Sequence, residues 1–217
     1  AQAVKWLPAA MNIDPSSPRC SQFYETLVKY NLPLLAHTGE EQAVDAKELQ
    51  ALGNPLLFRK PLDQGVKVIM AHCASIGTNI DIDTLANKKE VESITLFARL
   101  MDDKNYEGLL FGDISAITQV NRTQKALEMI YTTNDWHHRL VQGSDYPLPG
   151  VMPLISLSSF TDRGYIKQNE ADVLSAIRRY NPLLFDFVLK RTITVNGKSL
   201  KPSIFESAGV FKREKTI

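Results

Sequence analysis

Apolar runs of strand length alternate along this chain with segments of helical periodicity, and this alternation constrains the fold more than any other feature. The runs expected to form strands are 3–8, 32–37, 66–72, 108–115 and 139–143. Parallel strands need a crossover connection, usually a helix, so strands alternating with helices are typical of βα units. The sequence therefore predicts an α/β fold with a parallel sheet.

Helices are expected between and after these strands, at 20–30, 56–62, 91–101, 122–131, 169–180 and 181–190. In the first, Phe23, Leu27 and Tyr30 recur at helical spacing, and in the third Ile94, Phe97, Ala98 and Met101 share one face. The strands begin about 30 to 40 residues apart, the size of one βα unit. No Gly/Ser-rich linker divides the chain, so we expect one domain over 1–191 and a C-terminal tail over 192–217.

Charge and cysteine content narrow the classes of protein. The chain has 25 Lys and Arg against 24 Asp and Glu, for a net charge of +1, and lacks long runs of like charge. This balance argues against nucleic acid or an anionic membrane as partner. Two cysteines and no CxxC spacing argue against a disulfide framework or a structural zinc site, which favours a reducing, cytoplasmic location. No membrane span or signal peptide is expected.

Three expected strands end in a residue that can bind a metal, namely His37, His72 and Asp145. In a closed parallel barrel the carboxyl ends of the strands converge on one face, so these side chains would meet. Imidazole and carboxylate suit zinc or a similar divalent ion, which activates a bound water. Each residue alone also suits a structural role, and Asp145 lies in a sequence typical of turns. Their joint occurrence favours a metal site.

Five other residues of chemically active types could have either a structural or a functional role. His137 and His138 precede a strand, which would put them at the opposite rim, and we expect them to be structural or at the surface. Cys73, beside His72, is expected to fill space in the core. Arg59 and Lys60 are candidates for binding an anionic substrate group, although charged helix residues usually face solvent. The substrate-binding residues are otherwise unknown.

Three motifs in this order resemble a known family. They are LLAHTGE at 34–40, GVKVIMAHC at 65–73 and QGSDYP at 142–147. Together they resemble the amidohydrolase superfamily, and more narrowly the amidohydrolase-related, aminocarboxymuconate semialdehyde decarboxylase-like hydrolases of TIM-barrel fold. The resemblance covers roughly 3–190 and implies strands 4–8 of a (β/α)8 barrel, with 1–191 as its C-terminal portion.

The resemblance implies roles for the strand-end residues. His37 matches a metal ligand, Asp145 matches the carboxylate that touches the metal and takes a proton from bound water, and His72 matches a residue that binds a second metal or orients substrate. Asp145 and His72 would be catalytic, and His37, His72 and Asp145 would hold zinc or manganese. The implied reaction is hydrolysis or decarboxylation of a small carbonyl or carboxylate compound. In a dinuclear member a strand-four carboxylate or carbamylated lysine bridges the metals, and Lys5 is the candidate here.

The sequence departs from the family at its start. The family's first strand carries a His-x-His pair, and this chain has no His-x-His. The chain begins with Ala1, followed at once by a strand signal, so we expect the first three strands of a barrel of about 250 residues to be absent. Five strands cannot close such a barrel, and the exposed edge of an open sheet favours association with another chain. We therefore expect that the chain can form a homo-oligomer.

Two other functional classes remain open. The chain could be a non-catalytic half-barrel that acts as an interaction module, in which case it would have no activity of its own. A doubly wound α/β binding protein is disfavoured, because no glycine-rich phosphate-binding motif follows a strand.

Overall fold

The computed structural model describes residues 1–84 and 89–212, which divide into two compact units. The first unit comprises Ala1–Asp113 with the segment from Glu206 onward, and the second comprises Ile114–Phe205. The sequence predicts one domain, because no change of composition marks a boundary near residue 113. Each unit is described by itself.

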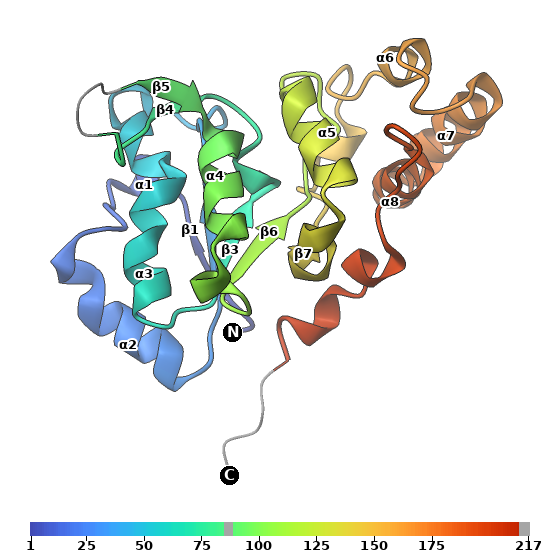
Figure 1. The fold of residues 1–217 in the computed structure, drawn as a ribbon. Helices are drawn as coiled ribbons and strands as arrows, with labels where there is room; N and C mark the ends of the chain where they lie inside the picture. The colour runs from blue at the N-terminus through green and yellow to red at the C-terminus, as the bar shows by residue number, and fades with distance from the viewer. Residues whose placement is uncertain (85–88, 213–217) are drawn as a thin grey trace. The chain divides into compact units, whose positions relative to one another are not determined.

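A parallel sheet forms the core of the first unit. Its strands are β1 (Val4–Trp6), β2 (Leu34–His37), β3 (Val68–Ala71) and β6 (Leu110–Asp113), in the order β1-β2-β3-β6. Figure 1 labels β1, β3 and β6. Neighbouring strands pair in parallel, with Leu34 opposite Val68 and His37 opposite Ala71. Every residue of β3 is buried, as expected for a parallel strand covered on both faces. The predicted α/β class and parallel sheet are confirmed.

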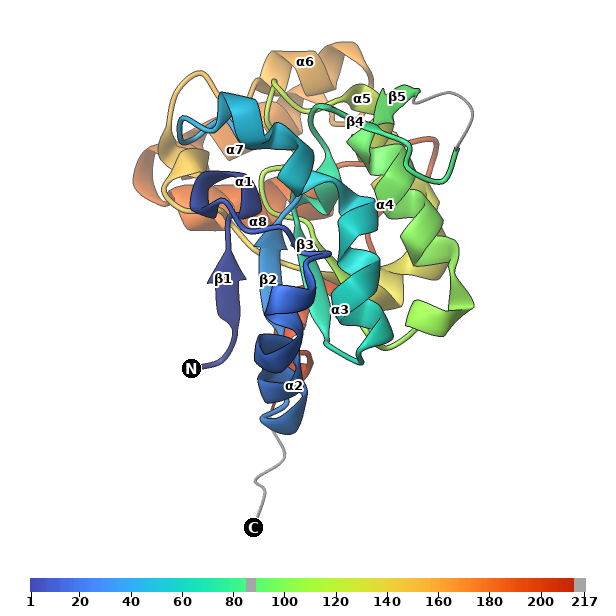
Figure 2. The same cartoon turned by 90° about the vertical axis from the view of Figure 1, so that its left-hand side faces the viewer.

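The helices of the first unit are α1 (Pro8–Met11), α2 (Ser21–Lys29), α3 (Arg59–Asp63) and α4 (Ser93–Asp102), and Figure 2 shows β1, β2 and β3 in that order beside α2 and α3. Three of them, α2, α3 and α4, occur where helical periodicity predicts them, whereas α1 was not predicted. Short 3₁₀ segments are Pro18–Cys20, Lys47–Gly53, Pro55–Phe58, His72–Ala74, Lys104–Tyr106 and Ser207–Gly209. The predicted face of α4 is buried throughout, whereas α2 buries Tyr24 and Leu27 and leaves Tyr30 exposed.

A small hairpin in the first unit was not predicted. Strand β4 (Thr78–Ile80) pairs antiparallel with β5 (Glu90–Glu92). Both strands are three residues long and largely polar, so neither produces the apolar run that indicates a buried strand.

The second unit is mainly helical. It contains α5 (Gln124–Thr132), α6 (Leu157–Asp162), α7 (Gln168–Tyr180) and α8 (Pro182–Thr192), with the short strand β7 (Leu140–Val141). Its 3₁₀ segments are Asn134–Arg139, Leu148–Gly150 and Pro202–Phe205. The Asn181 side chain begins α8 by accepting a hydrogen bond from the Leu184 amide at 2.9 Å. Residues expected to form a tail include Ile193, Val195 and Ile204, which are buried within this unit.

No helix in the described parts of the chain is long and apolar enough to span a membrane.

Candidate functional site

Two histidines meet at the carboxyl ends of neighbouring strands in the first unit. His37 is the last residue of β2, and His72 directly follows β3. Because His37 is opposite Ala71 in the parallel register, the two side chains leave the sheet at the same edge. Their ring centroids are 5.2 Å apart in an edge-to-face arrangement, and the residues are 8% and 5% exposed. The structure thus brings together two of the three predicted site residues.

Two carboxylates accompany these histidines, and sequence reasoning missed both. Glu41 Oε2 lies 3.5 Å from His37 Nδ1, and Asp113 Oδ2 lies 3.9 Å from His72 Nδ1. The backbone amide of His72 also donates to Asp113 Oδ2 at 3.4 Å. All four residues are buried, so the site combines two imidazoles with two carboxylates in a largely water-free environment.

The turn that carries His72 has an unusual backbone. His72, Cys73 and Ala74 have φ angles of 58°, 50° and 50°, in the left-handed region that disfavours residues with a Cβ atom. The Cys73 thiol donates to the Asp113 carbonyl at 3.3 Å, which ties this turn to the end of β6. Strained backbone of this kind is held in place by its surroundings and concentrates at functional sites.

The loop that follows His37 is fixed by a close approach of two glycines. The Gly39 amide donates to the Gly53 carbonyl at 2.8 Å, and the Glu40 amide donates to the Ile76 carbonyl at 3.1 Å. A Cβ atom on Gly39 would lie 2.5 Å from the Ile76 carbonyl oxygen, closer than any real contact. The loop in turn presents the Glu40 carbonyl to His37 Nε2 at 3.1 Å.

This geometry bears on whether a metal ion fits. A carbonyl only accepts hydrogen bonds, so His37 Nε2 carries its proton toward Glu40, and Nδ1 faces Glu41. The contact with Glu40 therefore engages Nε2, and only Nδ1, which faces the Glu41 carboxylate, could offer a lone pair to an ion. Among the described residues, no group of three or more His, Cys, Asp or Glu side chains is arranged to hold a metal. As placed, the residues do not fit a complete metal centre.

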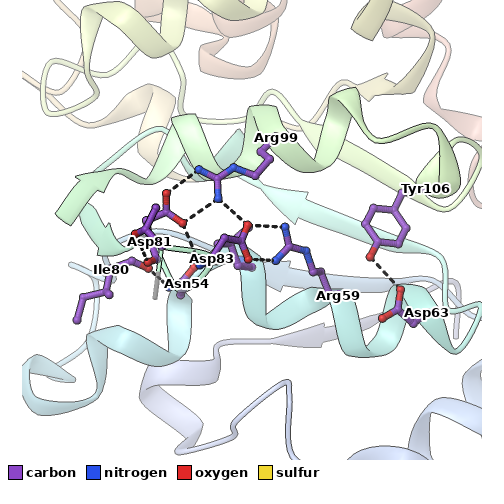
Figure 3. Close-up of polar contacts among 10 residues, drawn as sticks. Asn54, Arg59, Asp63, Ile80, Asp81, Asp83, Arg99 and Tyr106 are labelled. Carbon is purple, nitrogen blue, oxygen red and sulfur yellow. Dashed lines mark hydrogen bonds and ion pairs between the residues drawn. The ribbon is translucent and has the colours of Figure 1, made fainter. Parts of the chain in front are cut away.

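A network of arginines and aspartates lies elsewhere in the first unit (Figure 3). Asp83 accepts from Arg59 at 2.8 Å and from Arg99 at 2.6 Å, and Arg99 also pairs with Asp81. The hydrogen bond from Arg59 is the main cause that lowers the pKa of Asp83 to about 2. The charge of Arg59, a candidate for binding an anionic substrate group, is thus engaged by Asp83.

Asp145 belongs to the second unit and follows β7 in the chain. It has a φ of 54°, is half-buried, and its carbonyl accepts from the Leu148 amide at 3.0 Å, which makes a tight turn. Lys5, on β1, is exposed, whereas its neighbour Trp6 is buried. This alternation gives Lys5 the solvent-facing position on its strand.

A buried ion pair supports the chain just before Asp145. Lys190 Nζ donates to Asp186 Oδ2 at 2.7 Å and to the Gly143 carbonyl at 2.9 Å, and both charged side chains are inaccessible to solvent. Gln142 Nε2 donates to the same Asp186 oxygen at 3.1 Å. A helix in the second unit therefore fixes the backbone two residues before Asp145.

The remaining histidines differ in burial. His137 Nε2 donates to the Ile130 carbonyl at 3.0 Å inside the second unit, and burial lowers its pKa below the usual 6.5. His138 is exposed.

Comparison with known proteins identifies one distant structural likeness. No family model and no curated protein matches the sequence. Among solved structures, the chain matches a protein from Lactobacillus casei ATCC 334 described as a "putative metal-dependent hydrolase", with a TM-score of 0.32 and 20% sequence identity. The match covers 58% of this chain and 29% of that one, so it involves less than a third of the solved protein.

Proposed function

We propose that the protein is a metal-dependent hydrolase of the amidohydrolase-related type, acting on a small carbonyl or carboxylate compound by hydrolysis or decarboxylation. In this proposal its strands correspond to strands 4–8 of a TIM barrel. The observation that carries the proposal is the buried group His37, Glu41, His72 and Asp113 at the carboxyl edge of the parallel sheet.

General physical chemistry supports a functional role for these four buried residues. Burying ionisable side chains costs free energy unless they are paired, and such clusters concentrate where a protein needs perturbed acids and bases. In open and closed parallel α/β folds, ligands bind at the carboxyl ends of the strands. The left-handed turn at His72 adds a conformational cost at the same place.

His72 is proposed as the acid–base group of the site. Asp113 faces its Nδ1 atom, and a carboxylate in that position favours a proton on Nδ1 and leaves Nε2 either to exchange protons with a substrate or, as the alternative, to bind the metal. Asp145 is proposed as the second catalytic carboxylate.

The proposal includes a divalent metal, zinc or manganese, with His37, His72 and Asp145 among its ligands. Such an ion would lower the pKa of a bound water and polarise a carbonyl. His37 would have to exchange its contact with the Glu40 carbonyl for the ion, because that contact now occupies its Nε2 atom.

The experiment that tests the function is turnover of a panel of small chromogenic esters, amides and lactones by the zinc- or manganese-supplemented protein. Asp145→Asn should abolish turnover, because an amide cannot accept the proton that a carboxylate accepts. Asp135→Asn, an exposed aspartate of the same unit, is the matched control and should keep full activity. Equal turnover in Asp145→Asn and the parent protein would refute the assignment, and a parent without any turnover would favour the interaction-module alternative.

A further inference from the structure

A second concave site lies entirely within the second unit, in a cavity of about 80 Å³. It is bounded by the loop 117–123, the start of α5, and α6. Its polar lining includes two arginines, Arg122 and Arg163, and hydroxyl groups from Thr118, Ser156 and Ser159. No residue among those described in its lining carries a negative charge. From this lining we propose that the cavity binds a small oxyanion, a phosphate or carboxylate group.

Thr118 provides the observation that points to a ligand. The residue is 2% exposed, it lines the cavity, and its buried Oγ1 atom has no hydrogen-bond partner among the described residues. A hydroxyl left unpaired in the protein interior costs free energy, and native structures rarely tolerate it. An anion in the cavity would accept the hydrogen bond that this hydroxyl can donate.

The start of α5 adds a favourable field. Thr123 begins this nine-residue helix by accepting from the Ala126 amide at 3.2 Å, and both Thr123 and Gln124 line the cavity. Backbone amides and the helix dipole make such an end favourable for negative charge. Two guanidinium groups beside it supply the charge-assisted donors that phosphate and carboxylate prefer.

An acidic side chain of α5, Glu128, interacts electrostatically with Arg163 of the cavity. Glu128 lies on α5 outside the lining and accepts from Gln124 Nε2 at 2.6 Å and from the Tyr165 hydroxyl at 2.8 Å. These two donors are the largest causes that lower the pKa of Glu128, and the charge of Arg163 contributes less.

The volume limits what can enter. A single water needs roughly 10–15 Å³ of cavity volume, so a cavity of about 80 Å³ accommodates a group of a few heavy atoms. The ligand is accordingly a free anion or the charged end group of a larger molecule. This site does not depend on the proposed metal-dependent hydrolysis, because all of its residues lie in the second unit away from His37 and His72 in the sequence.

Calorimetric titration of the full chain with inorganic phosphate, sulfate and acetate tests the proposal, with sodium chloride at matched ionic strength as reference. We expect saturable binding that Arg163→Gln weakens about tenfold, since a charge-assisted donor is lost. Thr118→Val keeps the shape of the side chain and should weaken binding several-fold. Arg179→Gln, an exposed arginine of the same unit outside this cavity, should leave binding unchanged.

The valine variant also separates a binding role from a structural one. Removing an unpaired buried hydroxyl should leave thermal stability without anion equal to or above that of the parent, so weaker binding cannot be ascribed to misfolding. Glycerol phosphate then tests whether the ligand is a free anion or the charged end group of a larger molecule. Binding as tight as that of inorganic phosphate indicates an end group, whereas binding of inorganic phosphate alone indicates a free anion. Absence of saturable binding, or equal weakening by Arg179→Gln and Arg163→Gln, would overturn the proposal.

Discussion

His137 shows how one buried side chain can make stability depend on pH. Burial lowers its pKa in the folded protein below 6.5, so it stays neutral inside the second unit. As the pH falls below about 6.5, the unfolded chain binds a proton that the folded chain does not, and folding loses free energy until the folded pKa is reached. The stabilising contribution of neutral His137 is therefore complete above pH 6.5 and lost below it.

Urea unfolding between about pH 7 and pH 5 measures this effect. His137→Gln should flatten the acid-induced fall in the free energy of unfolding, because the titrating group is gone. His138→Gln removes an exposed histidine and should retain the fall seen in the parent. Identical slopes for the His137 and His138 variants would contradict the assignment.

Gly39 is the residue at which backbone geometry constrains the site most. Gly39→Ala should destabilise the protein by about 3 kcal/mol or more, since its new Cβ would meet the Ile76 carbonyl in addition to adopting a φ of +82°. Gly108→Ala is the matched control, with a φ of +83° and no atom within 4 Å, and should cost about 1–2 kcal/mol. The denaturant midpoints of the two variants measure these losses of stability. Equal losses would show that the loop around Gly39 can shift freely.

Residue-level prediction from the sequence succeeded where a side chain ends an apolar run. His37 and His72 could be placed together because each follows a strongly apolar strand, and parallel strands share an edge. Asp113 was missed because the strand was expected to continue to residue 115, whereas it ends at Asp113 itself. Glu41 lies in a loop whose path depends on Gly39 and Gly53, and no local pattern predicts that path.

At the scale of elements, α8 has a structural task that its sequence pattern does not reveal. Its Lys190 and Asp186 form an ion pair within the protein interior and hold the backbone at Gly143. Periodicity treats a lysine and an aspartate four residues apart as a solvated pair. Lys190 instead contacts the Gly143 carbonyl and Asp186 accepts from Gln142, both just after β7, and the pair is buried.

Lys190→Met should therefore destabilise the second unit by about 3–5 kcal/mol, because Asp186 would remain buried without its counter-charge. The double variant Lys190→Met with Asp186→Leu should recover much of that loss, since apolar groups of similar volume can replace a buried pair. Chemical unfolding followed by circular dichroism measures both. A loss below about 1 kcal/mol in the single variant would show that Asp186 is not held in a dry environment.

Long, strongly apolar or periodic elements were predictable, and short polar ones were not. The parallel strands and helix α4 occur close to their expected bounds. The β4–β5 hairpin and the buried stretch that includes Ile193 and Val195 depend on contacts with distant parts of their own units. Tertiary packing of this kind leaves little periodic signal in a few residues.

For the whole molecule, the sequence predicts the α/β class but not the division into two units, because no linker composition marks the boundary at residues 113 and 114. The first unit holds His37, His72, Glu41 and Asp113, and the second holds Asp145 and the cavity lined by Arg122 and Arg163.

The central proposal is that His37 gives up its contact with the Glu40 carbonyl and binds a divalent metal together with His72. Calorimetric titration of metal-free protein with zinc tests it most directly, using the parent chain, His37→Ala, His72→Ala and the exposed-residue control His138→Ala. We expect about one tightly bound ion per chain, with binding weakened about tenfold or more in the first two variants and unchanged in the third. Zinc binding of equal strength in all four proteins, or no saturable binding by the parent, would contradict it.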